Sequence, residues 1–459
     1  MTTVRNDTIV ATATAPGRGA IAIVRLSGPA AVEIGQKIAT PFPTAPREAV
    51  LAAIWGAELI DHGIITWYAV PASYTGEDVV EFAVHGGSLV STLVAEACVR
   101  AGARPALAGE FTERAVLHGK MDLVQAEAVA DLIDARTRAA HRAAVRQLDG
   151  ALSNRLNAMR DALLNVDALI AYDIDFPAED EGGPSRARVV KACDEAIEQV
   201  ERLLATLPAA ALGRDGALVV LAGPPNSGKS SLLNALVGEA RVIVSDIPGT
   251  TRDAVEVFVD DSPYPLRLVD TAGLRASGDV LERMGIEVSE RYLGEAQVVL
   301  VCGETAAELS AAVGVVSGLT QGSVVPVWTK IDRQNFSPRR HGGTRSYTEN
   351  NLLKGVRVSS VTGEGLDVLR EVIRAVLKNQ VAPPSDDMPL ITRARHETAL
   401  RRAAEELRGF RWAWEGGALP APVAATHLRA AVTALETLIG AVDVEDVLER
   451  VFRTFCIGK

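Results

Sequence analysis

Residues Gly223 to Ser230 have the types and spacing of a phosphate-binding loop. An apolar run (217–222) precedes the pattern Gly-x-x-x-x-Gly-Lys-Ser, and a helical pattern follows it. In such a loop, backbone N–H groups surround a β-phosphate at a helix N-terminus, where the helix dipole favours anions. The Lys229 ammonium reaches the β- and γ-phosphates, and the Ser230 hydroxyl ligates Mg²⁺. Because strand, loop and helix follow in this order, the pattern predicts a nucleotide site rather than a chance glycine turn.

Two later segments carry groups that a nucleoside triphosphate and its metal require. Thr250 and Thr251 end the run SDIPGTT, and either hydroxyl can close on Mg²⁺ and the γ-phosphate. Asp270 ends an apolar run and begins an Asp-x-x-Gly pattern that finishes at Gly273. We expect the Asp270 carboxylate to lie near the metal and a backbone N–H of this turn to bind the γ-phosphate.

The base is predicted to be guanine. The run VPVWTKID ends in Thr329-Lys330-x-Asp332, which is similar to the Asn-Lys-x-Asp base reader of GTPases. The Asp332 carboxylate would accept hydrogen bonds from guanine N1–H and the 2-amino group, a donor pair that adenine lacks, while the Lys330 stem packs on the base. Ser359 and Ser360 stand where guanine O6 is usually met by the backbone. Threonine cannot supply both an amide donor and an acceptor, so Thr329 predicts weaker nucleotide binding.

Together these motifs predict a GTP-binding domain. The predicted GTP-binding residues are Asn226, Ser227, Gly228, Lys229, Ser230, Ser231, Ser245, Asp246, Ile247, Pro248, Gly249, Thr250, Thr251, Asp270, Thr271, Ala272, Gly273, Thr329, Lys330, Asp332, Ser359, Ser360 and Val361. The Ser360-Val361 pair stands where Ala-Lys or Ala-Arg is usual, so here too we expect a guanine pocket that forms but holds nucleotide less tightly.

Leu274 follows the Asp-x-x-Gly pattern, where Ras-type GTPases carry a glutamine that orients the attacking water. Because leucine cannot hold a water, the catalytic group must come from elsewhere. Glu282 is a downstream carboxylate candidate at the start of an expected helix, and we predict that it orients the nucleophile. The alternative is that Glu282 only favours a helix N-terminus. No arginine stands in an obvious finger position, and the side-chain oxygen of Asn226 could ligate a monovalent cation instead.

Composition limits the class of protein. The chain has 459 residues, which is too long for one core, and its formal net charge of −11 leaves no broad basic field for binding nucleic acid unaided. The four cysteines are scattered without a Cys-x-x-Cys pair, which favours reduced thiols over a disulfide framework or zinc site. The sequence shows no signal peptide and no apolar stretch long enough to span a bilayer, so we expect a soluble, cytoplasmic protein.

The pattern of apolar residues predicts a multidomain fold. Residues 1–120 read as an α/β or β-rich domain, and the runs 121–148 and 154–172 read as long amphipathic helices. Short buried strands alternate with helices over 216–378, as in a Ras-like α/β P-loop GTPase domain. Helical patterns return after a Pro- and Asp-rich linker. We therefore expect 121–215 and 379–459 to form one discontinuous α-helical domain into which the G domain (216–378) is inserted.

Several flanking segments carry a resemblance to a known family. They are DTIVATATAPGRGAIAIVRLSG, SYTGEDVVEFAVHGG, GEFTERAVLHGKMDLVQAEAVADLIDA, IDFPAED and the terminal FCIGK. Together they resemble the tRNA-modification GTPase family MnmE (TrmE), whose G domain is of the TrmE-Era-EngA-YihA-Septin-like kind. The resemblance covers nearly the whole chain. It implies an N-terminal domain that binds tetrahydrofolate and dimerises, a helical domain with the FCIGK tail, and the inserted G domain.

The resemblance also implies a reaction. A homodimer of the family works with an FAD-dependent partner, MnmG/GidA-like, in a heterotetramer. Together they form a 5-(carboxymethyl)aminomethyl group on the wobble uridine of certain tRNAs. The one-carbon unit comes from 5-formyl- or methylene-tetrahydrofolate, and GTP, Mg²⁺ and K⁺ are required. The other reading of the motifs is a GTP-switched RNA or ribosome assembly factor without modification chemistry. A third is a folate-dependent one-carbon transferase regulated by its G domain.

The resemblance also implies site residues, several of which the motifs already indicate. The implied residues are Arg25, Glu81, Lys120 and Lys459 for folate, Ser230 and Thr251 for Mg²⁺, Asn226, Ser245, Ile247 and Thr250 for K⁺, and Glu282 as the catalytic glutamate. Cys456 has two readings: a redox or nucleophilic thiol delivered by the tail, or part of an apolar tail docked to order Lys459.

Overall fold

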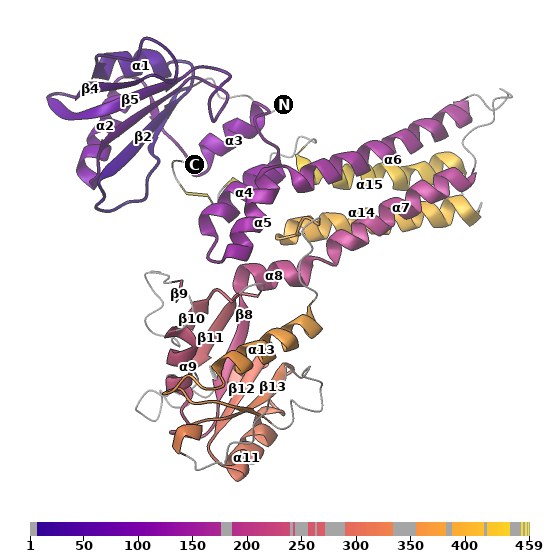
Figure 1. The fold of residues 1–459 in the computed structure, drawn as a ribbon. Helices are drawn as coiled ribbons and strands as arrows, with labels where there is room; N and C mark the ends of the chain where they lie inside the picture. Colours follow the sequence, from indigo (N-terminus) through magenta and orange to yellow (C-terminus); the bar gives the residue numbers. More distant parts are fainter. Residues whose placement is uncertain are drawn as a thin grey trace. The chain divides into compact units, whose positions relative to one another are not determined.

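The computed structural model describes residues 7–175, 186–238, 242–243, 256–261, 264–270, 290–333, 355–381, 388–416, 420–440, 451–452, 455–456 and 458 (Figure 1). The chain divides into two compact units. Unit 1 comprises 1–133, 146–200 and 398–459, and unit 2 comprises 134–145 and 201–397. Each is considered by itself. Among the described helices, none is both long enough and apolar enough to cross a membrane.

The N-terminal part of unit 1 is a seven-stranded sheet with two helices on one face. Its strand order is β3-β4-β5-β6-β2-β1-β7, and all neighbours are antiparallel except β1 and β7. The elements are β1 (Ile9–Thr12), β2 (Ile21–Ser27), α1 (Ala31–Ile38), β3 (Ala39–Thr40), β4 (Ala49–Trp55), β5 (Leu59–Tyr68), β6 (Val79–His85), α2 (Ser88–Arg100), β7 (Arg104–Pro105) and α3 (Glu110–Leu117).

Alternation along the strands separates the two faces of this sheet. Val24 and Phe82 point to the face that α1 and α2 cover, and both are fully buried. On the opposite face, Ile64 of β5 lies beside Leu51 of β4 and Ala83 of β6. Leu51 is 68% exposed and Ile64 is 47% exposed. A sheet with one covered and one open apolar face has surface to bury against a partner.

Buried ion pairs hold the edge of the sheet to α3. Arg114 donates to Asp7, Glu77 and Glu110, and Arg104 donates to Asp7 and Glu110. Arg114 is 5% exposed and Glu110 is 2% exposed. Burial alone would raise the pKa of Glu110, but hydrogen bonds from Arg104, the Leu107 backbone and Arg114 outweigh it, so that pKa is lowered. Burial is likewise outweighed at Asp7, where Arg104 and Arg114 lower the carboxyl pKa.

Arg114→Ala is expected to lower the free energy of unfolding of unit 1 by about 3 kcal/mol, because Glu77 would lose its charged partner while Glu110 keeps Arg104. Carboxylates with lowered folded-state pKa values stabilise the fold above their ordinary pKa, near 4, and that contribution is lost as the pH falls below it. Denaturant unfolding, monitored by amide hydrogen exchange in β1 and β2, measures the loss of stability in Arg114→Ala and the loss of stability at low pH. The exposed Arg100→Ala serves as the control and should change stability by no more than about 0.5 kcal/mol.

Helices form the rest of unit 1. They are α4 (Leu123–Asp134), α5 (Arg138–Leu148), α6 (Ala151–Asp175), α7 (Arg186–Leu204), α14 (Ala394–Gly416) and α15 (Ala421–Ile439), of which α4, α5, α7 and α14 extend into unit 2. In Figure 1, α6 lies beside α15 and α7 beside α14, although the G domain separates them in sequence. The Cys193 thiol of α7 contacts the Leu407 backbone oxygen of α14 (3.3 Å). The expected discontinuous helical domain is thus confirmed.

The single long helix expected over 121–148 is wrong, because the chain leaves the helical conformation at 135–137. Thr137 is the cause. Its hydroxyl accepts a hydrogen bond from the Ala140 backbone N–H (2.9 Å), which caps the start of α5, and donates to the Gly213 oxygen (2.6 Å). A threonine that bonds to backbone groups in this way favours a helix start over a helix interior.

Unit 2 contains the second seven-stranded sheet, with the order β14-β13-β12-β8-β11-β10-β9. The strands β11, β8, β12, β13 and β14 are parallel neighbours, and β10 and β9 add antiparallel pairs at one edge. The elements are α8 (Leu207–Asp215), β8 (Ala217–Ala222), α9 (Lys229–Gly238), β9 (Val242–Ile243), β10 (Glu256–Val259), β11 (Leu266–Asp270), β12 (Val298–Gly303), α11 (Ala306–Val316), β13 (Ser323–Trp328), η2 (Ile331–Arg333), β14 (Val356–Arg357) and α13 (Leu366–Gln380).

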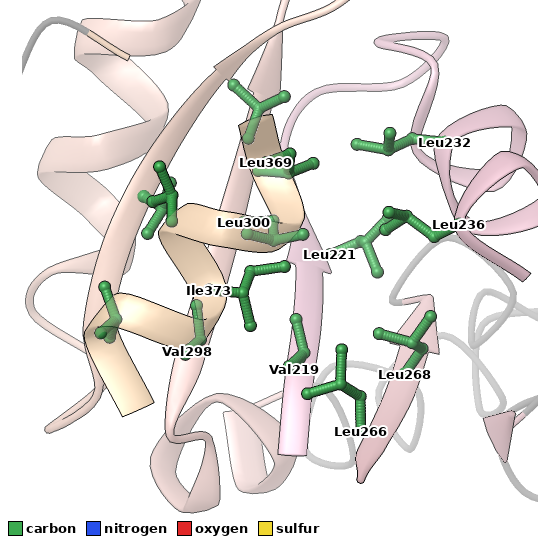
Figure 2. Packing of buried hydrophobic residues seen from close by; sticks show 14 of the residues in the cluster. Val219, Leu221, Leu232, Leu236, Leu266, Leu268, Val298, Leu300, Leu369 and Ile373 are labelled. Carbon is green, nitrogen blue, oxygen red and sulfur yellow. The ribbon is translucent and has the colours of Figure 1, made fainter. Parts of the chain in front are cut away.

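Helices cover both faces of this sheet. Figure 2 shows Val219 and Leu221 of β8 packed with Leu232 of α9 and Ile373 of α13. Val220, the residue between them, belongs to a second buried cluster that includes α11. Because β8 is buried on both faces, its continuous apolar run is typical of the centre of a parallel sheet. The observed unit is the P-loop GTPase-like domain that the sequence predicts.

Candidate nucleotide and folate sites

The predicted nucleotide residues that the structure describes meet at one edge of the second sheet. The phosphate loop follows β8, Asp270 ends β11, Thr329 follows β13 and Ser359 follows β14. These strands are parallel, so their carboxyl ends lie at the same edge, which is where α/β sheets bind ligands.

The phosphate loop has a backbone that requires glycine. A Cβ on Gly223 would lie 2.3 Å from the Cys302 oxygen, so β8 can turn this close to β12 only without a side chain. The Lys229 ammonium donates to the backbone oxygens of Gly223 (3.0 Å) and Pro224 (2.7 Å) within the loop. Ser227 Oγ is buried and has no hydrogen-bond partner in the described part of the chain. A loop with a buried lysine and an unpaired hydroxyl fits a nucleotide phosphate.

Ser230 and Asp270 are brought together as the metal prediction requires. The Ser230 hydroxyl donates to Asp270 Oδ2 at 2.5 Å, and Asp270 is 7% exposed. The Ser230 hydroxyl lies at the start of α9 and the Asp270 carboxylate at the end of β11, and both are oxygen ligands of the kind that Mg²⁺ prefers. The donor set therefore fits a magnesium ion held with a phosphate.

Thr329 connects the base-reading segment to the phosphate loop. Its hydroxyl donates to the Ser227 backbone oxygen (2.7 Å) and lies 3.3 Å from the Gly303 oxygen, and the side chain is 1% exposed. The hydroxyl is thus used within the protein. The weaker nucleotide binding expected from Thr329 stays a prediction.

Asp332 is held in place by Ser359. The Ser359 hydroxyl donates to Asp332 Oδ1 (2.7 Å) and accepts hydrogen bonds from the backbone N–H groups of Val361 and Thr362. Asp332 is exposed, so the carboxylate remains open to a base. Ser359, expected only near guanine O6, thus contacts the carboxylate that is predicted to select guanine.

Glu304 is a residue of this site that the sequence did not reveal. It follows β12 and pairs with the ammonium of Lys330, which also donates to the Asn226 oxygen (2.6 Å). The turn residues after β12 belong to no nucleotide-binding motif, so only the strand order of the sheet could have indicated it.

Several predicted site residues lie outside the described residues. They are Ser245, Asp246, Ile247, Pro248, Gly249, Thr250, Thr251, Thr271, Ala272, Gly273, Glu282 and Lys459. Leu274 lies outside them too.

Two of the predicted folate residues meet on the open face of the N-terminal sheet. Arg25 of β2 and Glu81 of β6 are direct cross-strand neighbours, and Arg25 donates to Glu81 at 2.8 Å. The Arg25 guanidinium lies 5.4 Å from the Tyr74 ring centroid and 5.8 Å from that of Phe111. Lys120 has a different partner: its ammonium donates to the Pro71 oxygen (2.9 Å).

The C-terminal tail packs against the same domain. The Gly109 N–H donates to the Cys456 oxygen (3.3 Å), while Phe455 is buried with Leu123 at the start of the neighbouring helix α4. A Cβ on Gly458 would lie 2.4 Å from the oxygen of Thr12, on the strand beside Arg25. The tail is therefore docked at the domain that carries Arg25 and Glu81.

The cysteines are all free thiols. Cys98, Cys193 and Cys302 are buried, and burial is the main cause that raises the pKa of each to about 12. Cys456 is exposed. Within the described residues, no cluster of His, Cys, Asp and Glu could hold a metal ion.

Comparisons with known proteins cover nearly the whole chain. The family model "GTP-binding protein TrmE N-terminus" matches residues 8–120, and "MnmE helical domain" matches 123–456. "tRNA modification GTPase MnmE" of Azoarcus sp. (strain BH72) is 41% identical over 99% of this chain and 98% of its own. That of Aquifex aeolicus (strain VF5) is 38% identical over 99% and 100%. The solved G domain of the T. maritima FeoB iron transporter aligns at 27% identity over 35% of this chain and 98% of that chain, with a TM-score of 0.26.

Proposed function

Because this chain belongs to the MnmE family of tRNA modification GTPases, we propose that it is a K⁺-dependent GTPase that acts with an FAD-dependent partner on tRNA. The pair forms the 5-(carboxymethyl)aminomethyl group on the wobble uridine of certain tRNAs, with a one-carbon unit from 5-formyl- or methylene-tetrahydrofolate. The observation that carries the proposal is the match to MnmE relatives over 99% of the chain. We also propose a cytoplasmic location and domain boundaries after residues 120, 215 and 378.

In the proposed nucleotide site, each group has one task. Lys229 gives up its loop carbonyl contacts to bind the β- and γ-phosphates, and Ser230 and Thr251 ligate Mg²⁺ while Asp270 lies behind the metal. Asp332 selects guanine. The Ser230–Asp270 and Ser359–Asp332 hydrogen bonds support these assignments, because they orient the groups before nucleotide binds.

In the proposed hydrolysis, one group provides positive charge at the phosphates and another orients the attacking water. A K⁺ ion held by Asn226, Ser245, Ile247 and Thr250 supplies positive charge beside the β- and γ-phosphates, as an arginine finger does. Glu282 orients the attacking water. The positive φ of Asn226 (61°) is compatible with a residue that turns its backbone at the phosphate loop and directs its side chain toward an ion.

The proposed folate site combines Arg25, Glu81, Lys120 and Lys459. Arginine and lysine can bind the glutamate carboxylates of a folate, and a carboxylate can bind its pterin edge. The docked tail supports this set, since Gly458 lies at the strand next to Arg25. The open apolar face around Leu51 and Ile64 supports a homodimer through this domain. The homodimer and two copies of the FAD-bearing partner would form a heterotetramer.

Deletion of residues 456–459 is expected to abolish tRNA modification and leave GTP hydrolysis nearly unchanged, because Lys459 would close the folate site while the nucleotide site lies in unit 2. Nucleoside analysis of tRNA from cells that carry only the truncated chain, together with phosphate release by the purified protein, measures both activities. A truncated chain that still modifies tRNA fully would exclude the tail from the site.

The deciding experiment for the proposed function is mass spectrometry of tRNA nucleosides from a strain that lacks this gene. Loss of the C5-modified wobble uridine, restored by the intact gene, is the expected result. An unchanged nucleoside profile would contradict the proposal and favour a GTP-switched assembly factor.

A further inference from the structure

Glu304 contacts the base-reading lysine, although no nucleotide-binding motif includes it. It follows β12 directly, and its carboxylate pairs with the Lys330 ammonium. The same ammonium donates a hydrogen bond to the Asn226 backbone oxygen (2.6 Å). Lys330 therefore joins the base-reading segment to the phosphate loop, and Glu304 holds Lys330 where it makes that contact.

The backbone at both ends of this connection needs support. Asn226 has a φ of 61° and Lys330 a φ of 54°. These left-handed conformations are uncommon for residues other than glycine and persist where surrounding contacts fix them. The hydrogen bond from Lys330 to Asn226 joins the two left-handed residues directly, so a change at the Lys330 ammonium reaches the phosphate loop in one step.

When nucleotide is bound, the negative charge of Glu304 affects where the Lys330 ammonium lies. The phosphates of GTP or GDP attract any nearby ammonium, and the flexible stem of lysine lets the charge move toward them. The Glu304 carboxylate, which pairs with the Lys330 ammonium, opposes movement of the ammonium toward the phosphates. We propose that Glu304 is a positioning residue that keeps the Lys330 ammonium at the Asn226 oxygen, so that the lysine stem lies along the guanine base and nucleotide dissociates slowly.

The inference rests on the proposed function, in which Lys330 packs on guanine and Asn226 ligates K⁺. Ion pairs between fully exposed side chains contribute little, because holding two long chains together costs entropy. Here the side chains of Lys330 and Glu304 are 27% and 35% exposed, and Lys330 is already fixed by a second acceptor. The pair is thus more ordered than an ordinary surface contact.

The test compares Glu304→Gln with Glu295→Gln, an exposed carboxylate in the same unit, in the full-length protein. Stopped-flow fluorescence measures dissociation of a fluorescent GDP analogue, and phosphate release measures the KCl concentration for half-maximal GTP hydrolysis. Glu304→Gln is expected to speed dissociation about two- to fivefold, the upper part of the range measured for ion pairs near the surface, and to raise the KCl requirement. Glu295→Gln should change neither quantity, and Glu304→Asp, which keeps the charge, should recover part of the slow dissociation.

An unchanged dissociation rate in Glu304→Gln would overturn the inference. Faster dissociation without a shift in the KCl requirement would overturn the connection to Asn226. If Glu304→Gln lowers the melting temperature of the protein, Glu304→Asp carries the test. Dissociation slower than in Glu304→Gln then supports a role for the charge, and dissociation equally fast overturns it. Failure of the proposed function is distinguishable, because it would appear in the unaltered chain as hydrolysis that does not depend on K⁺.

Discussion

Glu282→Ala is expected to lower kcat for GTP hydrolysis by about tenfold or more, with little change in GTP affinity. A group that only positions the attacking water acts in the transition state and contributes little to ground-state binding, so the loss should appear in kcat rather than in nucleotide affinity. Single-turnover hydrolysis in KCl and equilibrium binding of a non-hydrolysable GTP analogue measure the two quantities separately.

Leu274→Ala is the matched control for this prediction, because it alters the residue at the position of the Ras glutamine and removes no polar group. It should change kcat far less. Hydrolysis measured in NaCl tests the other half of the mechanism. Equal rates in Na⁺ and K⁺, or normal hydrolysis by Glu282→Ala, would show that this mechanism is wrong.

Asp332→Asn is expected to reduce GTP affinity by about 100-fold or more and to improve binding of xanthosine triphosphate. Guanine presents two donors to the Asp332 carboxylate, and hydrogen bonds to a charged group contribute about 1.5–3 kcal/mol each. An asparagine amide would meet the 2-amino group with its own N–H₂. Xanthine carries an oxygen there, which the amide can satisfy, and its N1–H still meets Oδ1.

Asp332→Asn is expected to keep the hydrogen bond with Ser359. The Ser359 hydroxyl donates to Asp332 Oδ1, and the asparagine side chain keeps an acceptor oxygen that can take the same hydrogen bond. Asp367→Asn, an exposed carboxylate of α13, is the control and should leave the ratio of GTP to xanthosine triphosphate affinity unchanged. A ratio that also stays unchanged in Asp332→Asn would rule out Asp332 as the base-selecting residue.

Strong local patterns made much of the fold predictable. The run 217–222 is apolar at every position and bounded by glycine, so it indicates a buried strand, and β8 is that strand. The strand β4 (Ala49–Trp55) was not predicted, because its alanines fit a helix equally well and only pairing with β5 decides the conformation. The break at Thr137 was missed for a similar reason: its hydroxyl bonds to Gly213, a residue distant in sequence.

The residues of the candidate nucleotide site that belong to a known motif could be predicted from the sequence. The contacts between one motif and another could not. Lys229, Ser230 and Asp270 were expected to act together, and they lie at one sheet edge. The hydrogen bond from Thr329 to Ser227 and the ion pair of Lys330 with Glu304 depend on strand order, which local sequence does not encode. Arg25 and Glu81 were predicted as separate folate contacts, but their cross-strand register makes them partners of each other.

The contrast among the cysteines gives the unaltered chain a built-in attachment point for a reporter. Only a thiolate reacts readily with a maleimide, and at neutral pH the buried thiols of Cys98, Cys193 and Cys302 stay protonated and inaccessible. Cys456 is exposed. A maleimide dye added to the native protein would therefore attach to the tail alone, without mutagenesis. Its emission would report on the surroundings of the docked tail in real time as candidate ligands are added.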